Sequence, residues 1–200
     1  MTGRMHWWLT TCALGAMACA RGANDAAPAA PVAADSAAVT RAREAANALG
    51  KDLQGLLFGQ LEKGGPVTAI AFCADSAQAR TARHASSGVY VRRVSLKVRN
   101  PANTPDAVER TTLEALAAQY ASGTLPAELV EVRGGGADRQ VHYIRPILVQ
   151  EKCLSCHGDP ALIDPAVKQV LTTRYPVDAA VGYRAGDLRG AISVRVPAPE

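Results

Sequence analysis

Methionine and tryptophan are absent from this sequence after its first twenty residues, and aromatic side chains are scarce throughout. Only 4% of the residues are aromatic while 48% are hydrophobic, so the chain has apolar surface for a core but little ring bulk. A cofactor could supply that bulk. Charge is not concentrated either, because 22 basic and 18 acidic residues give a formal net charge of +4 without a run of one sign. This pattern excludes the clustered basic surface of a nucleic-acid-binding protein.

The first twenty residues (1–20) have the features of an export signal. Arg4 precedes an apolar stretch, residues 7–20, which is too short to span a bilayer and ends in small residues suited to cleavage. Ala16-Met17-Ala18-Cys19 resembles the cleavage motif of bacterial lipoproteins, although alanine stands where leucine is usual. We therefore expect a periplasmic protein, anchored to a membrane by a lipid on Cys19. Cleavage after Ala20 is the alternative.

A segment rich in alanine and proline, residues 21–35, follows the signal. Such a composition cannot bury a core and behaves as a tether. The remaining residues, 36–200, have the usual length of one domain, and we expect a single one.

Two helices are expected at the start of this domain. Apolar residues recur at helical spacing from Ser36 until Gly64-Gly65-Pro66 ends the pattern, which predicts a long amphipathic helix. A second helix is expected from Pro66 to about Ser86, with Cys73 on its apolar face. Glycines inside the first helix cost stability, so a close contact should compensate; these are Gly50, Gly55 and Gly59.

The rest of the domain alternates between strand and helix patterns. Strands are expected over residues 89–100 and 141–149, with a helix over 104–120 between them and a short helix over 167–173 after them. Residues 179–183 and 191–196 flank a turn and predict a closing hairpin. The order predicts an α+β fold with antiparallel strands.

The motif that carries chemistry is Cys153-Leu154-Ser155-Cys156-His157, the attachment pattern of a c-type haem. Two thiols separated by two residues can reach the two vinyl groups on one edge of a porphyrin, and the next side chain then lies beneath the iron. One imidazole nitrogen can ligate the iron while a backbone carbonyl holds the other. We therefore expect one covalent haem c, bound by Cys153 and Cys156 and ligated by His157.

Other uses of this motif fit less well. A disulfide between Cys153 and Cys156 would close a strained loop, and a thioredoxin-like dithiol needs a strand-helix-strand context that the sequence does not have. A zinc site needs four ligands, and a second paired Cys/His cluster is absent from the sequence.

The second axial ligand of the iron is undecided from pattern alone. Methionine is excluded because every methionine lies in the signal. The candidates are Cys73, His84, His142, or an open or water-bound position. A lone cysteine on an apolar helix face is usually a small buried hydrophobe, His84 lies in a polar helix end, and His142 has the position of a partly exposed strand residue.

The residues resemble the PAS-like c-type haem domain family, long treated as a domain of unknown function. The matching stretches are GGPVTAIAFCADSA, VRRVSLKVRNPANTPDAVE, YIRPILVQEKCLSCHG and YPVDAAVGYRAGDLRGAISV. This resemblance implies a PAS-like antiparallel sheet flanked by helices, and Cys73 as the thiolate on the other face of the haem. It also implies that the haem propionates are bound by residues of the first strand segment; the candidates are Arg93, Lys97, Arg99 and Asn100. The alternative is that these side chains form a solvated strand face.

The function expected from these features is single-electron transfer at low potential, with a redox partner protein. A thiolate ligand donates negative charge to the iron and stabilises its ferric state. The alternative is a haem-based redox or gas sensor that works through a partner protein. Enzymatic turnover is not expected, since no acid/base pair for a peroxidase-like activity can be assigned.

Overall fold

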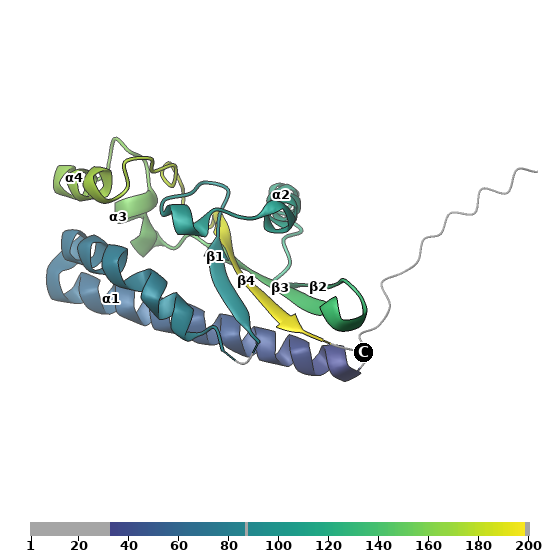
Figure 1. Ribbon diagram of the computed structural model, residues 1–200. Helices are drawn as coiled ribbons and strands as arrows, with labels where there is room; N and C mark the ends of the chain where they lie inside the picture. Colours follow the sequence, from purple (N-terminus) through teal and green to yellow (C-terminus); the bar gives the residue numbers. More distant parts are fainter. Residues whose placement is uncertain (1–32, 87, 199–200) are drawn as a thin grey trace, which may run out of the picture. The chain divides into compact units, whose positions relative to one another are not determined.

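The structure, a computed structural model, describes residues 33–86 and 88–198. Its helices and strands are α1 (Ala33–Arg83), β1 (Tyr90–Val94), α2 (Ala107–Ala121), β2 (Leu129–Arg133), β3 (Gln140–Leu148), α3 (Leu154–His157), α4 (Pro165–Arg174) and β4 (Leu188–Pro197). Short 3₁₀ helices are η1 (Pro101–Asn103), η2 (Gly136–Asp138) and η3 (Glu151–Cys153). The strands form one antiparallel sheet in the order β1-β4-β3-β2, and helices flank it (Figure 1). The expected α+β fold, with a long helix at its start, is confirmed.

α1 is not one straight helix. Its backbone leaves the helical conformation at Gly64 (φ −154°, ψ 18°) and Gly65 (φ 69°, ψ −170°), and Pro66 begins its second half. Residues with a Cβ rarely adopt the positive φ of Gly65. The chain folds back at this point, as Figure 1 shows, so both helices expected around Gly64-Gly65-Pro66 are present.

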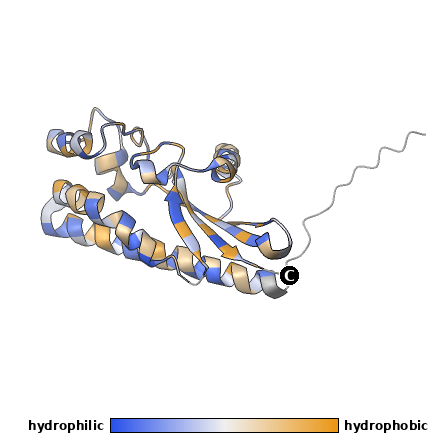
Figure 2. Ribbon diagram, in the orientation of Figure 1, coloured by the Kyte–Doolittle hydropathy of each residue, from blue (hydrophilic) through white to orange (hydrophobic). Residues whose placement is uncertain are grey.

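The first half of α1 covers one face of the sheet. Its inner side consists of buried small residues, Ala38, Ala42 and Ala46, followed by Leu49, and these let the helix approach the strands closely. Figure 2 shows hydrophobic and hydrophilic residues alternating along the strands and along α1. The strand residues that meet α1 therefore share one face; they are Val91, Val141, Tyr143, Ile192, Val194 and Val196.

α2 covers the opposite face of the sheet. Asp106 caps the helix, accepting a hydrogen bond from the Glu109 N–H at 2.9 Å, while the Glu109 carboxylate accepts one from the Asp106 N–H at 3.0 Å. Leu113 and Leu116 then pack against the strands in a core that contains Val94, Ile144 and Ala191.

The strands differ from the expected ones in three places. The first strand ends at Val94, because the Ser95 N–H leaves the sheet and bonds to the Asn103 carbonyl at 3.2 Å. β2 was not anticipated. The prediction of a closing hairpin is wrong, because residues 179–183 form no strand. Their backbone bonds instead to the CxxCH motif, with the Tyr183 N–H donating to the His157 carbonyl at 3.0 Å.

One of the three helix glycines has the expected close contact. A Cβ at Gly50 would collide with the guanidinium of Arg145, whose Nη2 donates to the Ala46 carbonyl at 2.9 Å. At Gly55 and Gly59, nothing in the described part of the chain lies within 4 Å of such a Cβ, apart from the neighbouring residues and the backbone of the helix itself. Gly50 therefore admits a β3 arginine against α1, whereas the other two glycines have no such contact.

The predicted signal, with Cys19, and most of the predicted linker lie outside the described residues. α1 begins at Ala33, a little before Ser36. Within the part of the chain that the structure describes, no helix has the length and apolar character needed to cross a bilayer.

An ion pair between α1 and the loop before β2 gives a pH prediction. Arg43 Nε donates to Glu128 at 2.9 Å and the Tyr143 hydroxyl donates to it at 2.7 Å, which lowers the Glu128 pKa from 4.5 to about 2. A carboxylate whose pKa falls on folding stabilises the protein above its unfolded pKa, and this stabilisation is lost as the pH falls toward its folded pKa. Because a third of the Glu128 side chain is exposed, we expect Glu128→Gln to lower the free energy of unfolding by only about 1 kcal/mol at pH 7.

Urea denaturation between pH 7 and pH 3 measures this effect. The difference from the wild type should shrink below about pH 4.5, the unfolded pKa. Glu114→Gln, on an exposed position of α2, is the control and should change little. A Glu128→Gln difference that is the same at both ends of the pH range would contradict the prediction.

Candidate functional site

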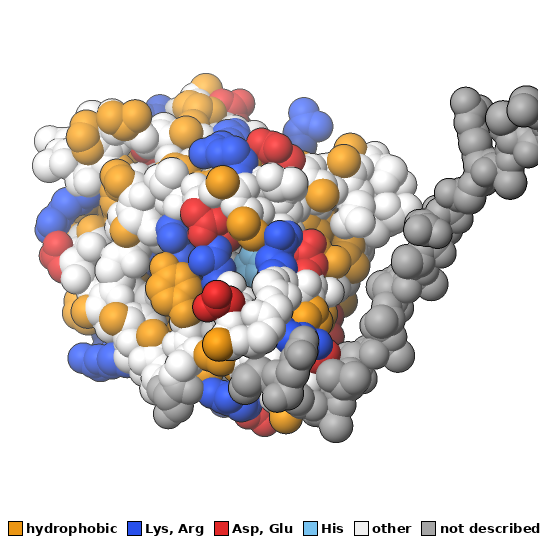
Figure 3. Space-filling view, turned by 45° about the vertical axis from the view of Figure 1, so that its right-hand side comes forward, with side chains coloured by type: hydrophobic (Ala, Val, Ile, Leu, Met, Phe, Trp, Pro, Cys, Tyr) orange, Lys and Arg blue, Asp and Glu red, His pale blue; other side chains and the backbone are white. Residues whose placement is uncertain are grey.

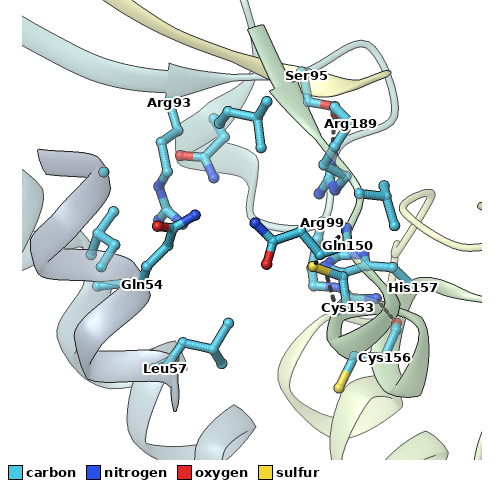
Figure 4. A pocket seen from close by; sticks show the side chains of 18 of the residues that line it. Gln54, Leu57, Arg93, Ser95, Arg99, Gln150, Cys153, Cys156, His157 and Arg189 are labelled. Atoms are coloured by element: carbon cyan, nitrogen blue, oxygen red, sulfur yellow. Dashed lines mark hydrogen bonds between the residues drawn. The ribbon is translucent and has the colours of Figure 1, made fainter. Parts of the chain in front are cut away.

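A cavity of about 320 Å³ lies between α1, the end of the sheet and the segment that contains the CxxCH motif. Its volume falls within the range of ligand pockets, roughly 300–1,000 Å³. Both halves of α1 contribute apolar side chains to its wall: Leu53, Leu56, Leu57, Leu61, Ala69 and Ile70. Figure 4 shows Gln54 and Leu57 of α1 on one side and Cys153, Cys156 and His157 on the other.

The motif enters the cavity through η3 and α3. Cys153 ends η3, and the single turn of α3 places Cys156 and His157 close behind it. Both cysteines are free thiols, partly exposed, and both line the cavity with His157. The two thiols and the imidazole of the motif therefore share one space.

The backbone holds the His157 ring by its Nδ1 atom. Nδ1 lies 2.7 Å from the Ala180 carbonyl oxygen, which can only accept, so the proton is on Nδ1 and the Nε2 lone pair is available. Burial, together with Arg99 and Arg189, lowers the His157 pKa to about 3, so the ring is neutral at pH 7. Arg99 Nη1 lies 3.4 Å from Nε2, and a metal ion at Nε2 would replace this weak contact.

Cys73 lies on the second half of α1 and lines the same cavity. It is a free thiol of intermediate exposure. Burial raises the pKa of this thiol, although the positive charge of Arg93 acts in the opposite direction. A protonated thiol of this kind would become a ligand by releasing its proton to solvent, because the positive charge of a bound metal favours the thiolate. The folding back of α1 thus brings together Cys73 and the motif, which lie far apart in the sequence.

The two other candidate ligands do not line the cavity. His84 directly follows the end of α1, and its Nε2 lies 3.1 Å from the carboxylate of Asp52, in the first half of the same helix. His142 is fully buried instead of partly exposed, on the α2 side of the sheet, with Nε2 at 3.0 Å from the Ser193 hydroxyl. Arg195 pairs there with Asp106 and Glu109. Figure 3 shows a face of the molecule on which acidic and basic side chains gather around a histidine.

The charge that lines the cavity is all of one sign. Among the described residues, no acidic side chain lines it, while the basic ones are Arg93, Arg99, Arg145, Lys152 and Arg189. Arg93 Nε is buried without a hydrogen-bond partner in that part of the chain. Burial and the neighbouring Arg189 lower the pKa of Arg93. A buried cation without a partner is costly, so this cavity is suited to an anionic ligand.

The residues of the cavity fit a haem. The leucines of α1 suit the flat apolar macrocycle, the arginines suit its two carboxylates, and the thiols and imidazole suit its covalent attachment and its iron. Among the described residues, no group of three or more His, Cys, Asp and Glu side chains could hold a bare metal ion.

The four residues proposed as propionate contacts have different surroundings. Arg93, Arg99 and Asn100 line the cavity, but the Asn100 side chain also caps η1, accepting from the Ala102 N–H at 3.0 Å. Lys97 does not line it; its ammonium donates to the Val181 carbonyl and lies over the Tyr183 ring.

Two cavity arginines were missed by sequence reasoning. Arg189 donates to the Ser95 hydroxyl at 2.6 Å, and Arg145 contacts α1 beside Gly50. Both arginines lie within or beside a run of apolar strand residues. An arginine at such a position indicates a buried charge, which needs a partner of opposite charge.

The comparison with known families identifies the chain. The model of the Tll0287-like family matches residues 24–197. The chain belongs to the Tll0287-like family. A solved structure, that of the cyanobacterial haem-protein Tll0287, matches with a TM-score of 0.55 and 28% sequence identity, covering 80% of this chain and 94% of that chain. No curated protein matches this member of the Tll0287-like family.

The unpartnered Arg93 gives a stability prediction. Replacing a buried, unpaired cation by an apolar side chain of similar length removes a desolvation penalty, so Arg93→Met should raise the free energy of unfolding of the ligand-free protein by about 1–2 kcal/mol. Urea denaturation of protein produced without haem measures this. Arg139→Met is the control, because Arg139 pairs with the buried Asp35 and its loss should destabilise the protein. A destabilised Arg93→Met variant would contradict the prediction.

Proposed function

We propose that this protein is a monohaem c-type haem protein on the outer side of the bacterial cytoplasmic membrane, which carries single electrons at low potential. One observation carries the proposal: the thiols of Cys153 and Cys156 and the imidazole of His157 line one cavity of apolar and basic character. The family match supports haem binding, since a member of similar fold is a haem-protein.

Haem, when bound, supplies an iron that changes between its ferric and ferrous states by one electron. Cys153 and Cys156 would hold it covalently through thioether bonds. His157 would ligate the iron through Nε2, because the Ala180 carbonyl already holds Nδ1–H. Such a partner fixes the tautomer and the ring orientation, and it raises the basicity of the ligand.

Cys73 is the proposed ligand on the other side of the iron. It is the one candidate among Cys73, His84 and His142 that lines the cavity. A thiolate donates more negative charge than an imidazole or a thioether and favours the ferric state. The low potential follows from this ligand.

The basic residues of the cavity would receive the carboxylates of the haem. Arg93 is the leading candidate because its buried Nε has no hydrogen-bond partner among the described residues. Arg189, which sequence reasoning did not single out, lies close enough to Arg93 to lower its pKa. Asn100 lines the same cavity.

The proposed location and partner come from the sequence. Residues 1–20 have the features of an export signal, and Cys19 has the position of a lipidated first residue. Covalent attachment of haem to CxxCH suits the same compartment. A redox partner protein of that compartment would exchange the electron.

Loss of the two motif cysteines tests the central proposal. The double variant Cys153→Ala, Cys156→Ala should carry no covalent haem, because the thioether bonds have no other sulfur at this spacing. Mass spectrometry and haem staining of the denatured protein measure this. Ser155→Ala, between the two cysteines, is the control and should keep full covalent loading. Covalent haem in the double variant would overturn the proposal.

Replacement of Cys73 tests the ligand and the low potential. In Cys73→Ala the low-spin thiolate signal of the ferric protein should vanish from its electron paramagnetic resonance spectrum, and the reduction potential should rise because negative charge is lost at the iron. Ser76→Ala on the same helix is the control. An unchanged spectrum would remove Cys73 from the iron and return His84 and His142 to consideration.

A further inference from the structure

Arg99 lies between β1 and η1, and its guanidinium is surrounded by groups of the His157 neighbourhood. Nε donates to the Asp178 carboxylate at 2.9 Å. Nη2 donates to the Cys156 carbonyl at 2.6 Å and to the Ala180 carbonyl at 3.2 Å. Both members of the Arg99–Asp178 pair are largely buried, with 12% of each side chain exposed. All five guanidinium hydrogens of an arginine point along fixed directions in one plane, so these contacts define one orientation.

The Ala180 carbonyl is the point where these contacts meet. It accepts from Arg99 and, at 2.7 Å, from His157 Nδ1. Asp178 holds the same residue from the other side, because its second carboxylate oxygen accepts from the Ala180 N–H at 2.8 Å. The acceptor that orients His157 is therefore fixed by a largely buried ion pair.

The Cys156 carbonyl extends this arrangement to the motif itself. Arg99 joins α3, which contains Cys156 and His157, to the loop that contains Ala180. Among the described residues this loop pairs with no strand. Its backbone bonds to the motif, from the Gly182 N–H to the Gly158 carbonyl at 2.8 Å, and to the segment before Arg99, from the Ala179 N–H to the Val98 carbonyl at 2.9 Å. The loop and the motif thus form one unit, and Arg99 bonds to both.

We infer that Arg99 is a positioning residue for His157, and not a partner of a haem propionate. The inference rests on the proposed function, in which His157 ligates the iron. Arg99 acts by holding the Ala180 carbonyl against Nδ1–H, which keeps the proton on that nitrogen and aims Nε2 into the cavity. Its Nε and Nη2 donate to Asp178, Cys156 and Ala180, and its Nη1 makes only the weak contact with His157 Nε2 that the iron would replace. The Nε of Arg93, by contrast, has no hydrogen-bond partner among the described residues.

The test is Arg99→Lys in the full-length, haem-loaded protein. Lysine keeps a positive charge for Asp178, but one ammonium group cannot reproduce the planar fork that also reaches the carbonyls of Cys156 and Ala180. We expect covalent haem at the wild-type level. Loss of one net hydrogen bond should make exchange of the His157 Nδ1 proton with solvent about five- to tenfold faster. The reduction potential should rise, because the imidazole becomes a weaker donor.

Proton NMR of the haem protein and a redox titration give the two measurements, and Arg139→Lys is the matched control. Arg139 is a largely buried arginine paired with Asp35, but it does not line the cavity. Wild-type proton exchange and potential in Arg99→Lys would overturn the inference. A change only in the pH dependence of the potential would also overturn it, because that result indicates a propionate partner.

Two further measurements keep the test decisive. If Arg99→Lys does not fold, Asp178→Asn replaces it, since the amide keeps an acceptor for the Ala180 N–H but loses the charge that holds Arg99; the same direction of change is expected. If the wild type carries no haem, the proposed function fails. Nitrogen-15 NMR of the His157 tautomer in that haem-free protein then tests Arg99 alone: Nδ1–H should dominate in the wild type and decrease in Arg99→Lys.

Discussion

The reversal of α1 at Gly64 and Gly65 is the constraint on which the cavity depends. The first half of the helix must stay on the sheet, because its alanines and Leu49 form the main core. A straight continuation would carry the second half, and Cys73 with it, beyond the end of the sheet. The positive φ of Gly65 turns the chain back instead, so that one helical segment supplies both the cover of the sheet and a wall of the cavity.

The two faces of the sheet differ in how their buried charges are paired. On the α2 side, the buried Glu109 has arginines near it, and Arg195 pairs with Asp106, so the charges there largely compensate one another. On the α1 side, Arg99 pairs with Asp178, but the buried Nε of Arg93 has no hydrogen-bond partner among the described residues. Uncompensated buried charge is rarely retained for stability alone. The asymmetry therefore indicates that the α1 side was shaped by a ligand and the α2 side by folding.

What the sequence could predict was local. Helical periodicity up to Gly64 and the spacing of Cys153, Cys156 and His157 depend on neighbours in the chain, and the structure contains both helices and places the motif at the cavity. Residues 179–183 were misassigned because their bonding partner, the motif, is a short helical segment and not a strand. Lys97 and Arg99 have equivalent positions in the alternating sequence pattern, yet only Arg99 lines the cavity. This difference depends on the contacts of Arg99 with the distant loop of Asp178 and Ala180. Such choices of partner leave no pattern along the chain.

The unpartnered Arg93 has a consequence for the life of the protein in the cell. Under the proposed function, a chain without haem bears the cost of burying the Arg93 Nε, which no other described residue bonds. It opens more often than the loaded chain, and proteases act on open chains. Cofactor loading would then determine protein abundance as well as activity, so that chains which lack the cofactor would be removed instead of accumulating.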